Sequence, residues 1–148
     1  MVASFCCQLL LASGRFNMQG NKLFYIFKDP LGSIDSKVGI TGHPAVRLGV
    51  YQNSYSRKSH VACFDVVYIG PARAIASLEK AVKQTLDWHI ERDGRGASEW
   101  VAQTYTTIEA QIDSLIDGYK FKISKVPKKY LPLTTDNLEK FLKEVVDK

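Results

Sequence analysis

The chain has 148 residues, of which 45% are hydrophobic and 24% are charged. That is the ordinary composition of a soluble globular protein, not of a low-complexity or membrane-embedded chain, and the length suits one domain, or one small domain with extensions. The formal net charge of +5 points to a polyanionic partner.

The first 20 residues do not match the pattern of those that follow. Their apolar core is short and follows no positively charged segment, so it does not predict a secretory signal. It is also too short to cross a bilayer. A flexible tail, an added packed helix, and an upstream start with Met18 as the natural first residue all stay open. Cys6, Cys7 and Cys63 have no metal-binding spacing. Reduced thiols in a cytoplasmic protein, with no membrane contact, are the prediction.

Two short strands and a helix are predicted in the next stretch of the chain. Residues 23–27 (LFYIF) are aromatic and aliphatic, as in a half-buried strand, and the DPLG sequence after them is turn chemistry. Residues 37–41 (KVGIT) make a second strand of the right length to pair with the first. Gly42 ends it, and Pro44 suits the first turn of a helix, where its missing N–H costs nothing. Pairing and helix together bring side chains from all three segments to one place.

The later elements complete a small α/β domain. Residues 61–69 are the most strand-like stretch and are predicted as the central strand. Residues 72–90 predict the longest helix, with an apolar face at helical spacing and Glu79 at the edge of that face, neither fully buried nor fully exposed. Residues 107–117 predict a second amphipathic helix. A Lys- and Pro-containing linker at 126–133 leads to a last helix that begins near Asp136 and docks on the domain. The expected fold is a three-stranded, mostly antiparallel sheet flanked by helices, with an added C-terminal helix.

The motifs in this order resemble the GIY-YIG nuclease domain, in the branch whose second signature reads K-[IV]-G-I-T. Tyr25 stands at the tyrosine of the first tripeptide, and KVG stands for the second. Arg47 falls eight residues after Gly39, Tyr51 follows one helical turn later, and Glu79 is the lone helical glutamate downstream. The sequence Ser98–Glu99–Trp100 matches a further element of that branch. The resemblance covers residues 22 to about 123, so we expect an N-terminal extension at 1–21, the nuclease-like domain at 22–123, and a basic linker with a C-terminal helix at 124–148.

The resemblance implies a Mg²⁺-dependent endonuclease that hydrolyses DNA, with Mn²⁺ as a substitute metal. Its residues fit that chemistry. The planar fork of Arg47 can hold two phosphate oxygens, and Glu79 can hold one Mg²⁺ that keeps most of its waters. Tyr25 would orient or deprotonate the attacking water with Lys37 as a neighbouring cation, and Tyr51 would bind the phosphate or the water. The resemblance also carries over His60, thirteen residues after Arg47.

The chain departs from the family pattern, and each residue has a structural alternative. The first tripeptide reads LFY, Lys37 replaces a tyrosine, and Glu99 lies where many members have an asparagine. Tyr25 could be core packing, and Arg47 and Glu79 could be a surface ion pair with each other.

Basic residues without nearby acids indicate a path for the DNA backbone. We expect contacts from Lys37, Arg47, Arg57 and Lys58. A second acid-free run at 119–135 is interpreted as a solvated loop. A lone active site would cut both strands as a homodimer or in two encounters. The alternatives are an inactive DNA-binding module on the same scaffold and a protein-interaction domain.

Overall fold

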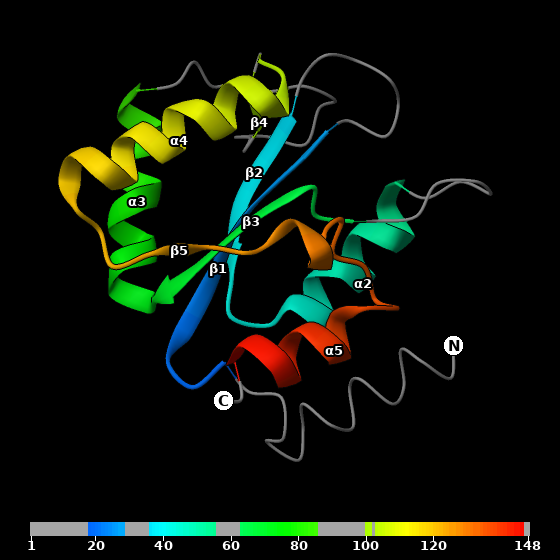
Figure 1. Cartoon of the computed structure of the whole chain (residues 1–148). Helices are drawn as coiled ribbons and strands as arrows, with labels where there is room; N and C mark the ends of the chain where they lie inside the picture. The colour runs from blue at the N-terminus through cyan, green and yellow to red at the C-terminus, as the bar shows by residue number, and fades with distance from the viewer. Residues whose placement is uncertain (1–17, 29–35, 56–62, 86–99, 102, 147–148) are drawn as a thin grey trace.

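The computed structural model describes residues 18–28, 36–55, 63–85, 100–101 and 103–146. The fold is α+β, an antiparallel sheet flanked by helices (Figure 1). In chain order the elements are β1 (Asn21–Lys28), β2 (Ser36–Thr41), α2 (Pro44–Tyr55), β3 (Val66–Pro71), α3 (Ala72–Thr85), β4 (Trp100–Val101), α4 (Tyr105–Tyr119), β5 (Ser124–Lys125), the 3₁₀ turn η1 (Lys128–Tyr130), α5 (Leu138–Phe141) and the π-helical turn η2 (Leu142–Val146).

Within the described residues the sheet has five strands in the order β4-β2-β1-β3-β5, not the three that were expected. All its pairs are antiparallel, and Tyr25 lies opposite Gly39 on β2 and Val67 on β3. The added strands β4 and β5 are two residues long, too short to leave a periodic signal in the sequence. The strand at 61–69 was predicted to be central, but β1 holds that position.

Each face of the sheet supports its own hydrophobic core. On one face, Leu23, Tyr25 and Phe27 of β1 pack against α2 and the C-terminal segment. On the other face, Phe24 and Ile26 pack against α3 and α4. Figure 1 shows α2 and α5 on one side of the strands and α3 and α4 on the other. The unbroken apolar run of β1 is therefore explained, because successive side chains enter opposite cores.

The starts of α2 and α4 are capped by threonine side chains, and the last helix begins at Leu138 rather than near Asp136. Thr41 Oγ1 accepts a hydrogen bond from His43 N at 2.9 Å, and the first turn of α2 closes with Arg47 N donating to His43 O at 3.1 Å. Pro44 occupies the first helical position, as predicted. At α4, Thr104 is the N-cap, and its hydroxyl accepts from Thr107 N.

The segment expected as a linker at 126–133 is part of the core. Val126, Tyr130 and Leu133 are buried with the apolar residues of α5 and η2. Phe64 and Leu133 exchange two backbone hydrogen bonds of 2.9 Å, which tie the segment to the start of β3. The C-terminal helix docks on the domain, as predicted, on the same face as α2.

Candidate functional site

Two tyrosines from distant parts of the chain meet beneath helix α2. Tyr25 projects from the central strand β1, and Tyr51 lies in the second turn of α2. Their hydroxyl oxygens are 2.6 Å apart, so one phenol donates to the other. Both residues are buried, Tyr25 at 1% exposure and Tyr51 at 6%, which makes Tyr51 the one nearer to solvent. A buried phenol needs such a partner, because an unsatisfied hydroxyl costs free energy.

The ring of Tyr25 is fixed by packing on one face and at its hydroxyl end. It stacks on Phe64 with a centroid distance of 4.1 Å and an interplanar angle of 12°. Its hydroxyl end lies directly over Gly39, where a Cβ atom would stand 2.4 Å from Tyr25 Oη. Gly39 is therefore the residue that gives the Tyr25 hydroxyl room to reach Tyr51.

Two cations predicted for the site lie at the ring of Tyr51. Lys37 Nζ is 5.6 Å and Arg47 Cζ is 6.0 Å from the ring centroid, within the range of cation–π attraction. Lys37 is half-buried on β2, whereas Arg47 is exposed on α2, one turn before Tyr51. The structure thus brings Tyr25, Lys37, Arg47 and Tyr51 together, and we call these four residues the phenol cluster.

Glu79, the predicted metal ligand, belongs to the other layer of the molecule. It lies on α3, whose buried residues Ile75, Leu78 and Val82 pack on the face opposite to the phenol cluster. Glu79 itself is half-buried, as its position at the edge of the apolar stripe predicted. Arg47 and Glu79 both lie among the described residues, and no ion pair joins them. The alternative prediction, that these two residues form a surface ion pair with each other, is therefore wrong.

The described residues show no fit for a metal ion beside the phenol cluster. They contain no group of three or more His, Cys, Asp or Glu side chains placed to hold a metal. A singly ligated Mg²⁺ does not need such a group, since water completes its shell, but the carboxylate assigned to it, Glu79, lies on the opposite side of the sheet. The predicted residues His60, Arg57 and Lys58, together with Glu99, lie outside the described residues.

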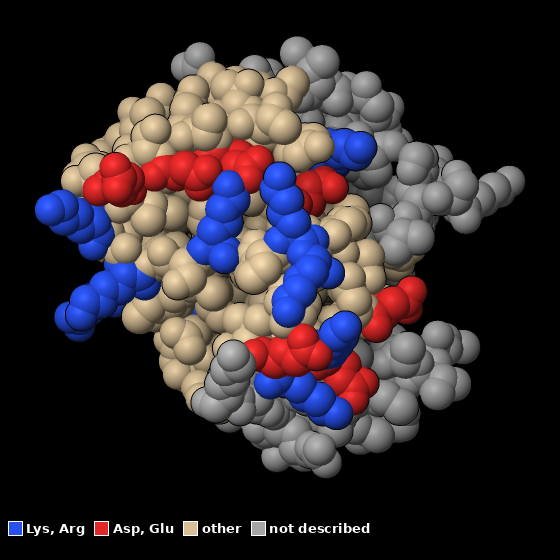
Figure 2. All heavy atoms as spheres, in the orientation of Figure 1, with Lys and Arg blue, Asp and Glu red and all other residues tan. Residues whose placement is uncertain are grey.

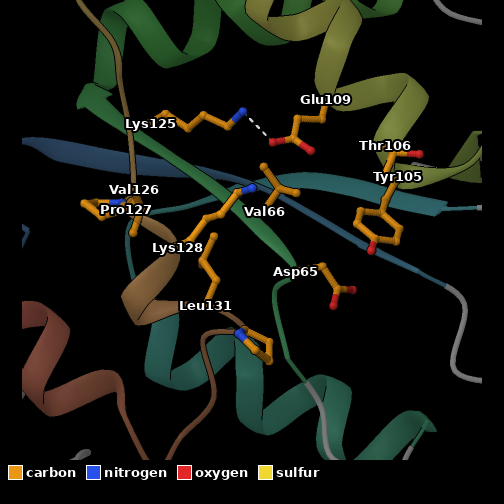
Figure 3. Close-up of a pocket in the computed structure, with 11 residues that line it drawn as sticks. Asp65, Val66, Tyr105, Thr106, Glu109, Lys125, Val126, Pro127, Lys128 and Leu131 are labelled. Carbon is orange, nitrogen blue, oxygen red and sulfur yellow. Dashed lines mark ion pairs between the residues drawn. The ribbon is translucent and has the colours of Figure 1, made fainter.

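A separate hollow of about 550 Å³ opens on the β5 side of the sheet. It is lined by the start of β3, the first turns of α4, and residues 125–132, and it holds none of the phenol cluster. Figure 3 shows Tyr105 pointing toward Asp65, and the ion pair between Lys125 and Glu109 at the opposite wall. Burial raises the pKa of Asp65 above its usual 3.8, although the Lys28 N–H that donates to its carboxylate at 2.9 Å partly opposes this.

Sequence reasoning missed two features of these regions. Gly39 was noted only as a letter of the KVGIT motif, and its contact with Tyr25 depends on strand register. The register follows from pairing the predicted strands with Leu23 opposite Thr41, so a two-strand alignment would have found it. Asp65 was not singled out, and an acid within an apolar run (CFDVVYI) was the available signal.

No family model, no curated protein and no solved structure matches this chain. Within the ranges that the structure describes, none of the helices has the length and apolar character that a membrane span requires.

Proposed function

We propose that this protein is a DNA endonuclease of the GIY-YIG type, with the phenol cluster at its reaction centre. The observation that carries the proposal is the 2.6 Å contact between Tyr25 and Tyr51 with Lys37 and Arg47 at the ring of Tyr51. These four residues come from β1, β2 and α2, and the sequence motif singles out the same four independently of the fold. Core packing accounts for the rings but not for two cations beside them.

The cluster has the groups that phosphodiester hydrolysis needs. Arg47 is exposed and can hold two oxygens of a phosphate with its planar fork. A phenol is a poor base unless its phenolate is stabilised, and a hydrogen bond from the second phenol and a nearby cation, Lys37, would stabilise it. At 6% exposure Tyr51 is the phenol nearer to solvent, so we assign to it the activation of the attacking water that was expected of Tyr25, and Tyr25 positions it from below.

The hydrolytic step balances one proton and one leaving group. The Tyr51 phenol first loses its proton to solvent; the water oxygen then bonds to phosphorus as the water's proton passes to the Tyr51 phenolate. The bond from phosphorus to the sugar oxygen breaks, and the leaving oxygen takes a proton from solvent. Arg47 balances the charge that develops on the phosphate oxygens. A positioned base of this kind contributes about 10²- to 10⁴-fold to the rate.

The metal stays a prediction from the resemblance. Glu79 is the carboxylate assigned to Mg²⁺, or to Mn²⁺ in its place, and a metal there would help to neutralise the phosphate charge. Glu79 lies on the helix that covers the opposite face, so no step above depends on the ion. A homodimer for double-strand cleavage and a cytoplasmic location belong to the same set of predictions.

One observation favours a second candidate, a DNA-binding module without catalysis. Tyr25 is 1% exposed and stacked on Phe64, as a purely structural tyrosine would be. In that case Arg47 would bind phosphate and the two phenols would serve only as core. The two candidates differ in one observable, the breaking of a phosphodiester bond.

Nicking of supercoiled plasmid separates these candidates. Wild-type protein is incubated with Mg²⁺, with Mn²⁺ and with EDTA, beside Arg47→Ala and Glu79→Gln. Arg73→Ala, which removes an exposed arginine from α3, is the matched control. We expect nicking that falls at least tenfold in Arg47→Ala, as happens when a group that stabilises the transition state is removed, and stays normal in Arg73→Ala. Glu79→Gln tests the metal assignment separately: metal-dependent nicking that is lost in this variant would support Glu79 as the ligand, and nicking at the wild-type rate would overturn that assignment. Folded protein that binds plasmid but cuts it under none of these conditions would exclude the nuclease and support the DNA-binding module.

A further inference from the structure

The C-terminal end of α4 carries an aromatic pair at the surface. Tyr119 is the last residue of the helix and is 63% exposed. Its ring stacks on Phe121 with a centroid distance of 5.3 Å and an interplanar angle of 16°. Phe121 is half-buried and packs against the core beneath α3 and α4. The pair is thus an open ring lying on an anchored one.

The backbone between the two rings is fixed by the helix cap. Lys120 adopts the left-handed conformation, with φ of 56° and ψ of 42°, and its N–H donates to Ile116 O. Phe121 N donates to the same carbonyl oxygen at 3.1 Å. This cap reverses the chain direction at the helix end, which is how residues two apart come to stack. The aromatic surface is therefore formed before any partner arrives, and binding need not pay to order it.

Lysines lie next to each ring. Lys120 and Lys122 are exposed, and neither has an ion pair within the described part of the chain, whereas Lys125 is held by Glu109 and Asp113. Figure 2 shows the acidic side chains as a row across this face, with basic side chains projecting beyond it at the edge where α4 ends in Figure 1. The exposed aromatic pair thus lies beside two lysines that form no ion pair within the described part of the chain.

We propose that Tyr119, Lys120, Phe121 and Lys122 form a binding surface for single-stranded nucleic acid, which we call the stacking platform. A base would stack on the open face of the Tyr119 ring, and the two ammonium groups would contact the flanking phosphates. Aromatic rings with nearby cations bind single strands in this way without reading sequence. In a duplex the bases are already stacked on one another, so the ring has no free base to take. The platform lies on α4, in the layer opposite the phenol cluster, and it rests on the proposed function only in sharing a nucleic-acid partner.

Fluorescence polarisation with a labelled oligo-dT strand tests the stacking. A strand of about 20 nucleotides is longer than the roughly 4–16 nucleotides that one single-strand-binding domain covers. We expect Tyr119→Ala to weaken binding about 5- to 150-fold, the range seen when a stacking ring is removed. Tyr119→Phe keeps the ring and should stay within about twofold of wild type, because any aromatic face can stack on a base. For a labelled duplex of the same length, Tyr119→Ala should weaken binding much less than it does for the single strand. Equal binding of the single strand by wild type and Tyr119→Ala, or an equal loss for both DNA forms, would overturn the platform.

The charges are tested through the salt dependence of the same binding. Lys120→Gly removes the ammonium group but suits the left-handed cap, so the fold is kept. Removing one phosphate contact should reduce the slope of log K against log salt by about 0.7 for a single strand. Lys122→Gln should act in the same way. Asp117→Asn removes an acid two residues before Tyr119 and should tighten binding. An unchanged slope in both lysine variants would contradict the phosphate contacts.

The platform and the proposed nuclease can fail separately. Wild-type protein that binds the oligonucleotide through Tyr119 but never nicks plasmid would keep the platform and overturn the nuclease. Plasmid nicking with no measurable binding of the single strand would keep the nuclease and overturn the platform.

Discussion

Replacing Gly39 with alanine tests how tightly β1 and β2 hold the Tyr25 hydroxyl in place. The new Cβ would stand 2.4 Å from Tyr25 Oη and 2.6 Å from Cζ. The ring has little room to retreat, because it is buried and stacked on Phe64 at 4.1 Å. Overpacking of a core typically costs about 1–3 kcal/mol, and loss of the hydrogen bond to Tyr51 adds about 1 kcal/mol. We therefore expect Gly39→Ala to lower the free energy of unfolding by about 2–4 kcal/mol.

Urea denaturation followed by circular dichroism measures this loss. The matched control is Gly49→Ala in α2, where a Cβ would meet no atom within 4 Å. Alanine is the better helix former, so this variant should gain about 0.5–1 kcal/mol. The two glycines thus predict changes of opposite sign from the same substitution. A Gly39→Ala protein as stable as wild type would refute the packing of Tyr25 over Gly39.

Three further outcomes follow from one buried and two half-buried polar groups. Burial raises the pKa of Asp65 in the folded protein above 3.8, its value in the unfolded chain, so the folded state holds the proton more tightly. The folded protein therefore loses stability as the pH rises from 3.8 through the raised pKa and the carboxyl group ionises. Asp65→Asn should therefore be more stable than wild type at neutral pH, with a gain that shrinks below pH 3.8 in urea titrations; a loss at neutral pH and no pH dependence would contradict the sign. Tyr68→Phe removes a 2.8 Å hydrogen bond to Asp113 and should cost about 1.5 kcal/mol in the same assay, whereas no change would mean that the bond contributes nothing. Burial also raises the pKa of Cys63 to about 12, so its alkylation by iodoacetamide at about pH 8, followed by peptide mass mapping, should be far slower than for a free thiol.

Local chemistry predicted the elements, and pairing decided their places. The sequence correctly predicted the strands at 23–27 and 37–41 and the helix that begins at Pro44. Turn residues and a helix-starting proline mark the ends of these elements in the sequence. The position of β1 at the centre was missed in favour of the apolar run at 61–69. A strand with every residue buried from Leu23 to Phe27 must have cover on both faces, and the LFYIF sequence carried that information.

The C-terminal half of the molecule shows where pattern reasoning stops. Residues 126–133 contain lysines and prolines and were interpreted as a linker. Val126, Tyr130 and Leu133 are nonetheless buried, spaced four and three residues apart. Three apolar residues at this spacing do not predict burial by themselves, because the segment forms only a short 3₁₀ turn and has no longer periodic pattern. The strand β5 just before it carried no periodic signal at all.

The candidate site was predictable in part for the same reasons. Tyr25, Lys37, Arg47 and Tyr51 converge because two paired strands and the next helix are adjacent in sequence, so local geometry fixes them. Glu79 is on a helix whose own periodicity predicted its half-buried position correctly. The face that this helix covers depends on the path of the whole chain, which no local pattern contains.

The most direct test of the nuclease proposal is the rate of plasmid nicking by Tyr51→Phe. This change removes one hydroxyl, the partner of Tyr25 at 2.6 Å, and leaves the ring and both cations in place. We expect a folded protein that still binds DNA and nicks it about 10²- to 10⁴-fold more slowly than wild type in Mg²⁺. A Tyr51→Phe protein that nicks plasmid at the wild-type rate would show that the phenol cluster is core packing and not the reaction centre.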